Sequence, residues 1–510
     1  MAKRLPAVDA PLPGIEHIVV LMLENRSFDN ILGTLPSSPE FWGLPLTKTN
    51  TYTDKDGLSC TVPVTNQPPS GQSVFVAPNP DPGEPYDDMT AQIFGYQQDG
   101  TPIDPCKDTD AKATMAGFAQ NYYDVAEGKG GVAGDIMTYF TPDQVPVSSY
   151  LAGQYAVCDQ WSASGPVQTF PNRLFAHCGT PGAWHLPLDR NLHAFLNDID
   201  YLPFLPLADR TVFELLDQGA AKPDPANWKV YFHDVSLSAV LTKYVADAFL
   251  DASPCVASFD GSDFDPPFGT TFAQDVLDDT LPAYAFIEPR YYDNVSGSGG
   301  PSNSNHPGNS GILGEAPARS VADGEQLVLD VFAALVANPA VMAKTLLIVT
   351  YDEHGGVYDH VPPPSGAAEG VVSPFPGDAM PVNFDYCRLG VRVPTFFFNP
   401  CIPPNTLFRP AADNTHFDHT SLIATVRDQF GLGATLTPRD AAAPTLVGLI
   451  PAGATPQDED YTQRLRTLQA AVTTLAPGKP GKPVSRPDPV KWLAEIIEWL
   501  LKARRQAAGL

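Results

Sequence analysis

Long apolar runs are absent from this 510-residue sequence, and none approaches the roughly 20 residues that a helix needs to cross a bilayer. The first residues, Met1 to Pro6, include two basic side chains but have no apolar stretch behind them. Neither a transmembrane segment nor a secretory signal is therefore expected. The chain is expected to be cytoplasmic, or secreted with its leader already removed.

Positive charge is scarce. Lysine and arginine number 31 against 58 aspartate and glutamate residues, which gives a formal net charge of −27 at pH 7. This balance argues against nucleic acid as a partner, because a phosphate backbone binds a cationic face. It also argues against electrostatic adhesion to anionic lipid. A small anionic group can still bind where a metal or oriented N–H groups supply positive potential.

Closely spaced cysteine pairs are absent as well. The seven cysteines include no C-x-x-C pair and no zinc-ribbon spacing. Their odd number leaves at least one free thiol.

What the sequence does contain is a repeated pattern in which an apolar run ends in polar residues. The first run, residues 18–23, leads into Glu24-Asn25-Arg26-Ser27-Phe28. Four later runs are 228–232, 283–287, 345–351 and 393–398, and they lead into His233-Asp234, Glu288, Asp352-Glu353-His354 and Asn399. Such runs are typical of strands buried on both faces. Polar residues just past the carboxyl ends of such strands are where open α/β sheets keep their binding sites.

A helix is predicted between the second and third of the later runs. Apolar side chains recur at helical spacing over residues 325–338, and Pro339 stops the pattern. Strand, helix and strand in succession form a βαβ unit. We therefore predict an α/β fold with a mostly parallel central sheet, helices on both faces and long loop insertions. The polar strand ends are expected to meet at one edge of the sheet.

The chain is predicted to divide into one large domain and a tail. Residues 10–455 are expected to form the catalytic domain, with a loop-rich insertion at 36–110 that is dense in Pro, Gly, Ser, Asp and Thr. Residues 456–487 are predicted as a linker and 488–507 as an amphipathic C-terminal helix. That helix is expected to dock on the catalytic domain, and peripheral contact with a membrane is the alternative.

A hydroxyl group precedes a second predicted helix. Pro171, followed by Asn-Arg-Leu-Phe-Ala, indicates a helix start and leaves Thr169 just ahead of the first turn. A hydroxyl there faces unpaired backbone N–H groups and the positive end of the helix dipole. This position suits a nucleophile that attacks a phosphate. The alternative is that Thr169 only caps the helix.

Five motifs occur in order along the chain. They are Glu24-Asn25-Arg26-Ser27-Phe28-Asp29, Thr169-x-Pro171-Asn172-Arg173, Asn305-His306-Pro307, Asp352-Glu353-x-Gly355-Gly356-x-Tyr358-Asp359-His360 and Gly390-Val391-Arg392-Val393-Pro394. Together they resemble the phosphoesterase family of bacterial and plant non-specific phospholipases C and related acid phosphatases, within the alkaline-phosphatase superfamily. The resemblance implies an alkaline-phosphatase-like α/β/α sandwich.

The resemblance also implies a metal site. Its ligands would be Glu24, Asn25, Asp352 and Glu353, with Thr169 Oγ1 as a further one. One divalent cation is expected there, and an all-oxygen ligand set favours Ca²⁺, Mg²⁺ or Mn²⁺ over Zn²⁺.

Further roles follow from the same motifs. His306, His360 and His233 would contact phosphate oxygens or protonate the leaving alkoxide, and a structural hydrogen bond is the alternative for each. Asn172 and Arg173 are expected to bind substrate.

Two nearby residues are given supporting roles. Arg26 is expected to brace the loop that carries Glu24 through charge-assisted hydrogen bonds. His419 is expected to cap or orient the helix that begins near Asp418 rather than to bind zinc.

The sequence therefore indicates a phosphoric ester hydrolase with a phosphothreonine intermediate. It would act either as a phospholipase C on phospholipids or as an acid phosphatase on small phosphomonoesters. One alternative is a sulfatase-like or phosphonate-handling enzyme of the same superfamily, although Thr169 is unable to become the formylglycine that sulfatases use. The other is a non-catalytic phosphate-binding homologue.

Overall fold

The computed structural model describes residues 11–475 with gaps. The gaps are 37, 106–107, 109, 127, 182–209, 219–222, 252, 263–268, 292–299, 309–319, 376–383, 385 and 413–414. The predicted C-terminal helix at 488–507 lies outside the described residues.

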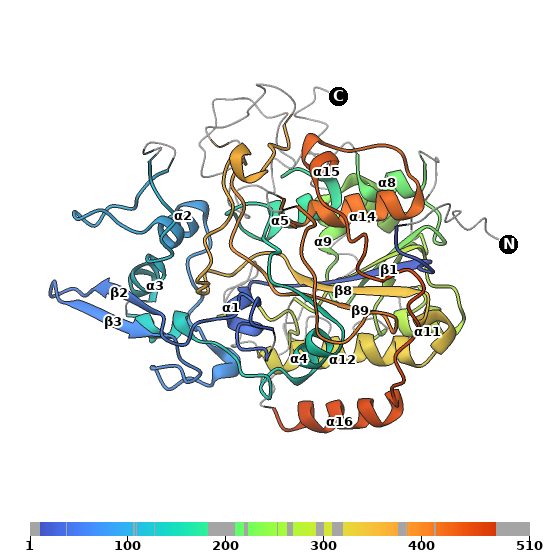
Figure 1. Ribbon diagram of the computed structural model, residues 1–510, viewed down its shortest axis with the longest axis horizontal. Coiled ribbons are helices and arrows are strands. Elements are labelled where there is room, and N and C mark those ends of the chain that lie inside the picture. Colours follow the sequence, from blue (N-terminus) through green and yellow to red (C-terminus); the bar gives the residue numbers. More distant parts are fainter. Residues whose placement is uncertain are drawn as a thin grey trace.

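An eight-stranded sheet forms the centre of the fold, in the order β10-β4-β9-β8-β1-β7-β5-β6. Figure 1 labels three of its neighbouring strands, β9, β8 and β1. Its strands are β1 (His17–Leu23), β4 (Ala156–Cys158), β5 (Trp228–Phe232), β6 (Val256–Ser258), β7 (Tyr284–Ile287), β8 (Thr345–Tyr351), β9 (Thr395–Phe398) and β10 (Thr406–Leu407). Neighbouring strands are parallel except where β9 pairs with β8 and with β4.

Helices cover both faces of this sheet, which confirms the predicted fold class (Figure 1). On one side lie α5 (Thr169–Cys178), α8 (Val212–Leu216), α9 (Leu237–Leu241), α14 (Thr420–Phe430) and α15 (Pro438–Ala442). On the other lie α4 (Pro146–Gln154), α11 (Phe272–Leu277), α12 (Val321–Val336) and α16 (Tyr461–Thr473). Among the described residues, no helix combines the length and the apolar character that a membrane crossing requires.

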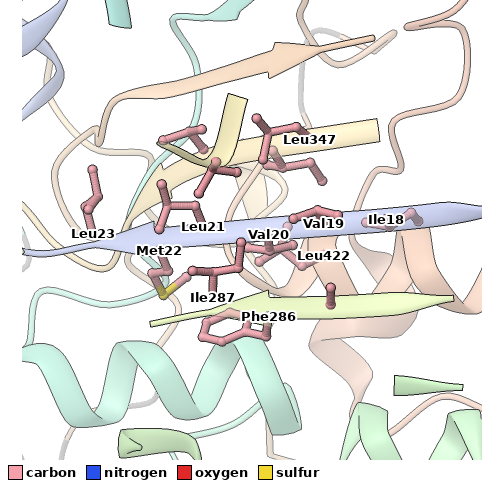
Figure 2. Close-up of a cluster of buried hydrophobic side chains, with 14 of the residues drawn as sticks. Ile18, Val19, Val20, Leu21, Met22, Leu23, Phe286, Ile287, Leu347 and Leu422 are labelled. Carbon is pink, nitrogen blue, oxygen red and sulfur yellow. The ribbon is translucent and has the colours of Figure 1, made fainter. Parts of the chain in front are cut away.

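Strand β1 occupies the middle of the core. All seven of its residues are buried, and Val19 is in register with Ala285 of β7 on one side and Leu347 of β8 on the other. Figure 2 shows the β1 side chains packed against those of neighbouring elements, including Phe286 and Leu422. A continuous apolar run is required here because helices cover both faces.

Strand β9 runs in the direction opposite to the one we expected. It is antiparallel to β8, so Asn399, which follows it, lies at the edge of the sheet where β8 begins. There Asn399 Nδ2 donates hydrogen bonds to the carbonyl oxygens of Thr345, at 2.9 Å, and of Ala343, at 3.3 Å. The expectation that Asn399 joins the polar strand ends is therefore wrong. Arg392, just before β9, takes that place instead.

The insertion at 36–110 contains regular structure as well as loops. It includes a hairpin of β2 (Thr49–Thr53) and β3 (Ser59–Pro63) and the helix α2 (Tyr86–Phe94), which packs on α3 (Phe118–Ala126). A second hydrophobic cluster joins these elements to Val357, in the loop after β8. The insertion is thereby fixed against the edge of the sheet that carries Asp352.

The segment 456–475, where we predicted the start of a linker, contains α16. This helix packs against α12 and α4. Leu468 and Val472 are buried, and Tyr461 and Leu465 pack against the core at helical spacing.

One buried carboxyl group of the fold gives a testable prediction. Glu325 of α12 is 1% exposed and accepts hydrogen bonds from the N–H groups of Val147, at 2.6 Å, and Ser148, at 3.2 Å, and from the Ser148 hydroxyl. Burial raises the pKa of Glu325 from 4.5 to about 7, because these hydrogen bonds compensate the desolvation only in part.

The folded state therefore binds this proton more tightly than the unfolded state, and stability falls as the pH rises from about 4.5 to about 7. Glu325→Gln, whose amide can keep the same partners without a charge, should gain up to about 3 kcal/mol at pH 8 over wild type. Urea unfolding at pH 5 and pH 8 checks this, with Glu16→Gln, at a partly exposed carboxylate, as control. A variant less stable than wild type at pH 8 would contradict it.

Candidate active site

The ends of β1 and β8 approach each other closely at the carboxyl edge of the sheet. Asn25 has a φ of 57°, in the left-handed region that is unfavourable for residues other than glycine. Its backbone N–H donates to Asp352 Oδ1 at 3.1 Å. A Cβ atom at Gly355, where φ is 62°, would lie 2.1 Å from the Asn25 carbonyl oxygen. Glycine at 355 is therefore what allows this approach.

Asp352 is the centre of the site's hydrogen bonds. Besides Asn25, its Oδ1 accepts from the Glu353 N–H at 2.8 Å, and its Oδ2 accepts from Arg173 Nε at 3.0 Å. Its carbonyl oxygen lies 2.6 Å from Nε2 of His419, the residue that precedes α14. Asp352 and Arg173 are fully buried. Their side chains therefore have fixed positions relative to the end of β1.

Arg173 supplies the positive charge of this region. Its Nη2 donates to the last two carbonyl oxygens of β1, both at 3.3 Å. Burial lowers the pKa of the guanidinium, but Tyr291, Asp352 and Glu24 together outweigh this effect and raise it. The geometry gives Arg173 a bracing role between α5 and two strands, and contact with substrate stays a prediction.

Thr169 is the first residue of α5, one position further into the helix than we expected. The N-cap residue is Gln168, and its side chain makes no capping hydrogen bond. Thr169 Oγ1 donates instead to Asn25 Oδ1 at 3.3 Å. The hydroxyl is therefore directed at the end of β1 and at the helix start, where backbone N–H groups have no partner within the helix.

Asn172 binds the loop that leads into α5. Its Nδ2 donates to the carbonyl oxygens of Val167, at 2.6 Å, and Gly165, at 3.2 Å, and its Oδ1 accepts from the Gly165 N–H at 3.1 Å. These contacts support a role in holding Thr169 in place, and substrate binding by Asn172 stays a prediction.

His306 is joined to the end of β1 through the insertion. Its Nε2 lies 3.8 Å from Glu84 Oε1 and its Nδ1 lies 3.6 Å from Asp81 Oδ1. Glu84 Oε1 in turn accepts from Asn25 Nδ2 at 2.8 Å. Of the three predicted histidines, His306 is therefore the one that the described contacts connect to Asn25 and Thr169.

His360 belongs to a separate buried network. Its Nδ1 lies 2.7 Å from Asp29 Oδ2, and Arg392 binds Asp29 Oδ1 at 2.9 Å and Asp359 Oδ1 at 3.0 Å. Burial raises the pKa of Asp359 to about 6, while Arg392 acts to lower it. These contacts give His360 a structural partner, and its catalytic role stays a prediction.

His233 lies on the other side of β1, where β5 and β7 end. Its Nδ1 is 3.3 Å from Arg290 Nη2 and 3.8 Å from Asp260 Oδ1. Because a guanidinium only donates hydrogen bonds, the Arg290 contact requires Nδ1 to be the acceptor and places the proton of a neutral ring on Nε2. No described contact links His233 to Thr169, and its role in the reaction stays a prediction.

Arg26 connects two loops around the site, as we expected. It is fully buried, and its Nε donates to the Asn305 carbonyl at 2.8 Å while Nη1 donates to the Ala77 carbonyl at 2.7 Å. Burial lowers the pKa of Arg26 to about 10. The loop after β1 is thereby tied to the insertion and to the loop that carries His306.

The donor set of the predicted metal site suits a hard cation. Its members are fully or almost fully buried: Glu24, Asn25, Thr169, Asp352 and Glu353. They combine three carboxylates with an amide and a hydroxyl, and the described contacts place one guanidinium, that of Arg173, on them. Oxygen donors of these types favour Ca²⁺, Mg²⁺ or Mn²⁺. The donor types of these residues therefore fit the implied cation.

The carboxylates themselves are not gathered around one point. Among the described residues, two groups bring three ligand atoms within 4.8 Å of one another. They are Asp29, Asp359 and His360, and Asp81, Glu84 and His306. In the first group a guanidinium already compensates the charge. The carboxylates of Glu24, Asp352 and Glu353 do not make up such a group.

Sequence reasoning missed three residues of this region, namely Asp81, Glu84 and Arg290. Asp81 and Glu84 lie in the Pro- and Gly-rich insertion, where no periodicity marks them. Arg290 follows β7 by three residues, and its position after a buried strand was the one available signal.

A cavity of about 410 Å³ opens at the same edge of the sheet. Its lining includes Gln160, which follows β4, and Arg392, which precedes β9. Because β9 is antiparallel, both positions lie at the edge where β8 ends. Trp42, Val361 and three consecutive prolines, 362–364, make much of the lining apolar.

A doubly covered, mostly parallel sheet with buried carboxylates, an amide and a hydroxyl at its carboxyl edge defines the molecule as an enzyme of the α/β class. The sequence pattern of the phosphoesterase family matches residues 15–433. The chain therefore belongs to the phosphoesterase family and is a phosphoric ester hydrolase, as predicted.

Curated relatives agree with this assignment. Non-specific phospholipase C4 of Arabidopsis thaliana is 32% identical over 458 residues, which cover 87% of this chain and 73% of the relative. Non-specific phospholipase C5 of the same plant is 33% identical over 452 residues, covering 87% and 75%. Phospholipase C A of Mycobacterium tuberculosis is 28% identical over 450 residues, covering 83% and 75%.

Two solved structures show weak similarity to this chain. A protein of the alkaline phosphatase superfamily from Vibrio parahaemolyticus has a TM-score of 0.31 and 12% identity, covering 65% of this chain and 80% of its own. The lipoteichoic acid synthase LtaP from Listeria monocytogenes has a TM-score of 0.31 and 10% identity, covering 72% and 86%. At these scores the similarity supports no argument about function.

Proposed function

We propose that this enzyme hydrolyses phospholipids on the glycerol side of the phosphate, with Thr169 as nucleophile and a phosphothreonine intermediate. The observation that carries the proposal is the position of Thr169. Its Oγ1 lies at the start of α5 and 3.3 Å from Asn25 Oδ1, at the carboxyl edge of the sheet. The relatives named as phospholipases C supply the substrate class.

The reaction would proceed in two displacements. In the first, Thr169 Oγ1 forms a bond to phosphorus and releases its proton to solvent, while the bond from phosphorus to the glycerol oxygen breaks. His306 gives a proton to that leaving oxygen. In the second, water attacks phosphorus, the bond to Oγ1 breaks, and one proton of the water returns to His306 as Oγ1 regains its own.

The remaining residues would orient these groups. N–H groups at the start of α5 can donate to the phosphoryl oxygens as negative charge develops on them. Arg173 holds α5 against the ends of β1 and β8, and Asn172 holds the loop before α5. Together they would keep Thr169 in line with the phosphorus. The proposed cation, held by Glu24, Asn25, Asp352 and Glu353, would lower the pKa of the Thr169 hydroxyl and offset negative charge.

The relatives named as phospholipases C favour a phospholipid over a small phosphomonoester. Phosphomonoesters remain the second candidate substrate.

A comparison of two chromogenic esters tests the substrate class. We expect p-nitrophenyl phosphorylcholine, a diester, to be hydrolysed with a higher kcat/KM than p-nitrophenyl phosphate, a monoester. The reverse preference would identify a phosphatase. If the enzyme hydrolysed neither ester and no phospholipid, the proposed function would be contradicted.

The proposed cation gives a prediction that does not depend on activity. Because the ion binds only the folded state, Ca²⁺, Mg²⁺ or Mn²⁺ at about 100 times its Kd should stabilise the chelator-treated protein by about 2.7 kcal/mol. Glu353→Gln and Asp352→Asn should each reduce this gain, because a neutral amide replaces a charged ligand. Thermal unfolding with and without each metal measures it.

Glu16→Gln is the matched control, since Glu16 is about one-third exposed and lies at the opposite end of β1. It should keep the full gain. Equal metal-induced stabilisation of wild type and both site variants would contradict the ligand assignment.

A further inference from the structure

Glu84 is the part of the insertion that reaches the centre of the site. It lies two residues before α2, and its side chain is 8% exposed. Its Oε1 accepts a hydrogen bond from Asn25 Nδ2 at 2.8 Å. Through this hydrogen bond, a side chain of the insertion contacts Asn25, the residue that faces Thr169.

The contact decides which way round the Asn25 amide stands. The oxygen and nitrogen of a carboxamide occupy nearly the same volume, so packing alone does not distinguish the two orientations. A carboxylate accepts hydrogen bonds and does not donate them. Glu84 therefore holds Nδ2 toward itself and directs Oδ1 toward Thr169 Oγ1, 3.3 Å away.

The segment that carries Glu84 is itself held in place. Gln92 Nε2 of α2 donates to the Gly83 carbonyl at 2.6 Å, and Gln92 Oε1 lies 2.9 Å from His354 Nε2, in the loop after β8. A Cβ atom at Gly356 would lie 2.7 Å from Pro82 Cβ. The loop before α2 is thus packed directly on the loop that follows Asp352.

We propose that Glu84 is a positioning residue for catalysis, which acts by orienting the Asn25 amide toward Thr169. This inference rests on the proposed role of Thr169. It assigns to the insertion at 36–110 a part in the reaction itself, through a single buried carboxylate.

Substitution at 84 should change turnover more than substrate binding. Glu84→Ala removes the acceptor, so Asn25 can turn its Nδ2 toward Thr169, and we expect kcat to fall by about 10- to 100-fold with KM within about threefold of wild type. Glu84→Gln can still accept through its amide oxygen and should restore most of the rate. Hydrolysis of p-nitrophenyl phosphorylcholine measures both values.

Asp88→Ala is the matched control. Asp88 lies in the first turn of α2, and its Oδ1 accepts from Asn121 Nδ2 at 2.6 Å, a carboxylate–amide hydrogen bond of the same kind outside the site. Thermal unfolding of all variants identifies general destabilisation. We expect Asp88→Ala to keep the wild-type kcat, and an equal loss of kcat in Asp88→Ala and Glu84→Ala would overturn the proposal.

A double-mutant cycle tests the route of the effect. In an Asn25→Ala background, where no amide remains to orient, Glu84→Ala should change the single-turnover rate by less than about twofold. If the fold-losses in rate of the two single variants multiply in the double variant, the proposal is overturned. Because Glu84 also lies 3.8 Å from His306 Nε2, the same cycle is run with His306→Ala. Coupling to His306 in place of Asn25 would likewise overturn it.

The Thr169→Ala variant keeps this test separate from the proposed function. Wild-type turnover by Thr169→Ala would refute the nucleophile assignment whatever Glu84 does. An inactive Thr169→Ala variant, together with multiplicative losses at 84 and 25, would refute only the positioning role.

Discussion

Thr169→Ala should reduce turnover by at least about 10⁴-fold, since loss of a covalent nucleophile removes the whole two-step route. The residue does not cap α5, because Gln168 occupies the N-cap position. The folded state should lose little more than one hydrogen bond to Asn25, about 1 kcal/mol. Turnover of p-nitrophenyl phosphorylcholine and urea unfolding measure the two effects side by side.

Thr169→Ser is the matched control for this prediction. It keeps a hydroxyl at the same helix start, and it should therefore retain appreciable activity. Two results would contradict the assignment: wild-type turnover by the alanine variant, or an inactive serine variant whose stability and metal-induced stabilisation match wild type.

Arg392→Met should destabilise the protein by about 3–5 kcal/mol, because it leaves buried carboxylates without their cation. Arg392 is 2% exposed and binds Asp29, at 2.9 Å, and Asp359, at 3.0 Å, both of which are buried. It also donates to the carbonyl oxygens of Trp42 and Asp159, both at 3.0 Å. Methionine has a similar length but replaces none of these four contacts.

The loss should depend on pH in a defined direction. The pKa of Asp359 is already raised from 3.8 to about 6. The contribution of Asp359 to the free energy of unfolding of the wild type therefore falls as the pH rises from about 3.8 to about 6. Arg392 acts to lower that pKa, Asp29 to raise it and His360 to lower it. Without Arg392 the pKa should rise further, so the destabilisation should be larger at pH 8 than at pH 5.

An exposed pair provides the comparison. Lys344 and Glu16 are 3.2 Å apart and more than one-third exposed, and Lys344→Ala should cost no more than about 1 kcal/mol. Urea unfolding at both pH values measures the two variants. Equal small losses in Arg392→Met and Lys344→Ala would show that the buried network is not a major source of stability.

The sequence was sufficient to locate five of the eight strands of the central sheet, because burial on both faces demands continuous apolar runs. Strands β4, β6 and β10 have only two or three residues each and were not predicted. Strands β5 and β8 have the predicted limits, and β1 differs by one residue. The direction of β9 was not predictable in the same way. An apolar run has no polarity, and the antiparallel pairing with β8 depends on the chain path before it.

The candidate site was predictable where its residues follow a buried strand or lie at the start of a helix. Asn25, Thr169 and Asp352 are of this kind, and the structure links them through hydrogen bonds. Glu84 was not found, because its role depends on how the insertion folds back onto the edge of the sheet. Asn172 was assigned to substrate from its motif, whereas its hydrogen bonds hold the loop before α5.

The sequence contains a helical pattern at α16 that we did not use in the prediction. Tyr461, Leu465, Leu468 and Val472 recur at helical spacing, but the Pro/Gly/Lys segment that follows led us to extend the linker over them. The side of α16 that carries these apolar residues packs on α12 and α4.

The stereochemical course at phosphorus tests the central claim most directly. A phosphodiester made chiral at phosphorus with oxygen isotopes would be hydrolysed in isotope-labelled water, and the configuration of the product phosphate would be determined by NMR. Transfer to Thr169 and then to water comprises two in-line displacements, each with inversion, so the account predicts net retention. Net inversion would mean that water attacks phosphorus directly and that Thr169 forms no covalent intermediate.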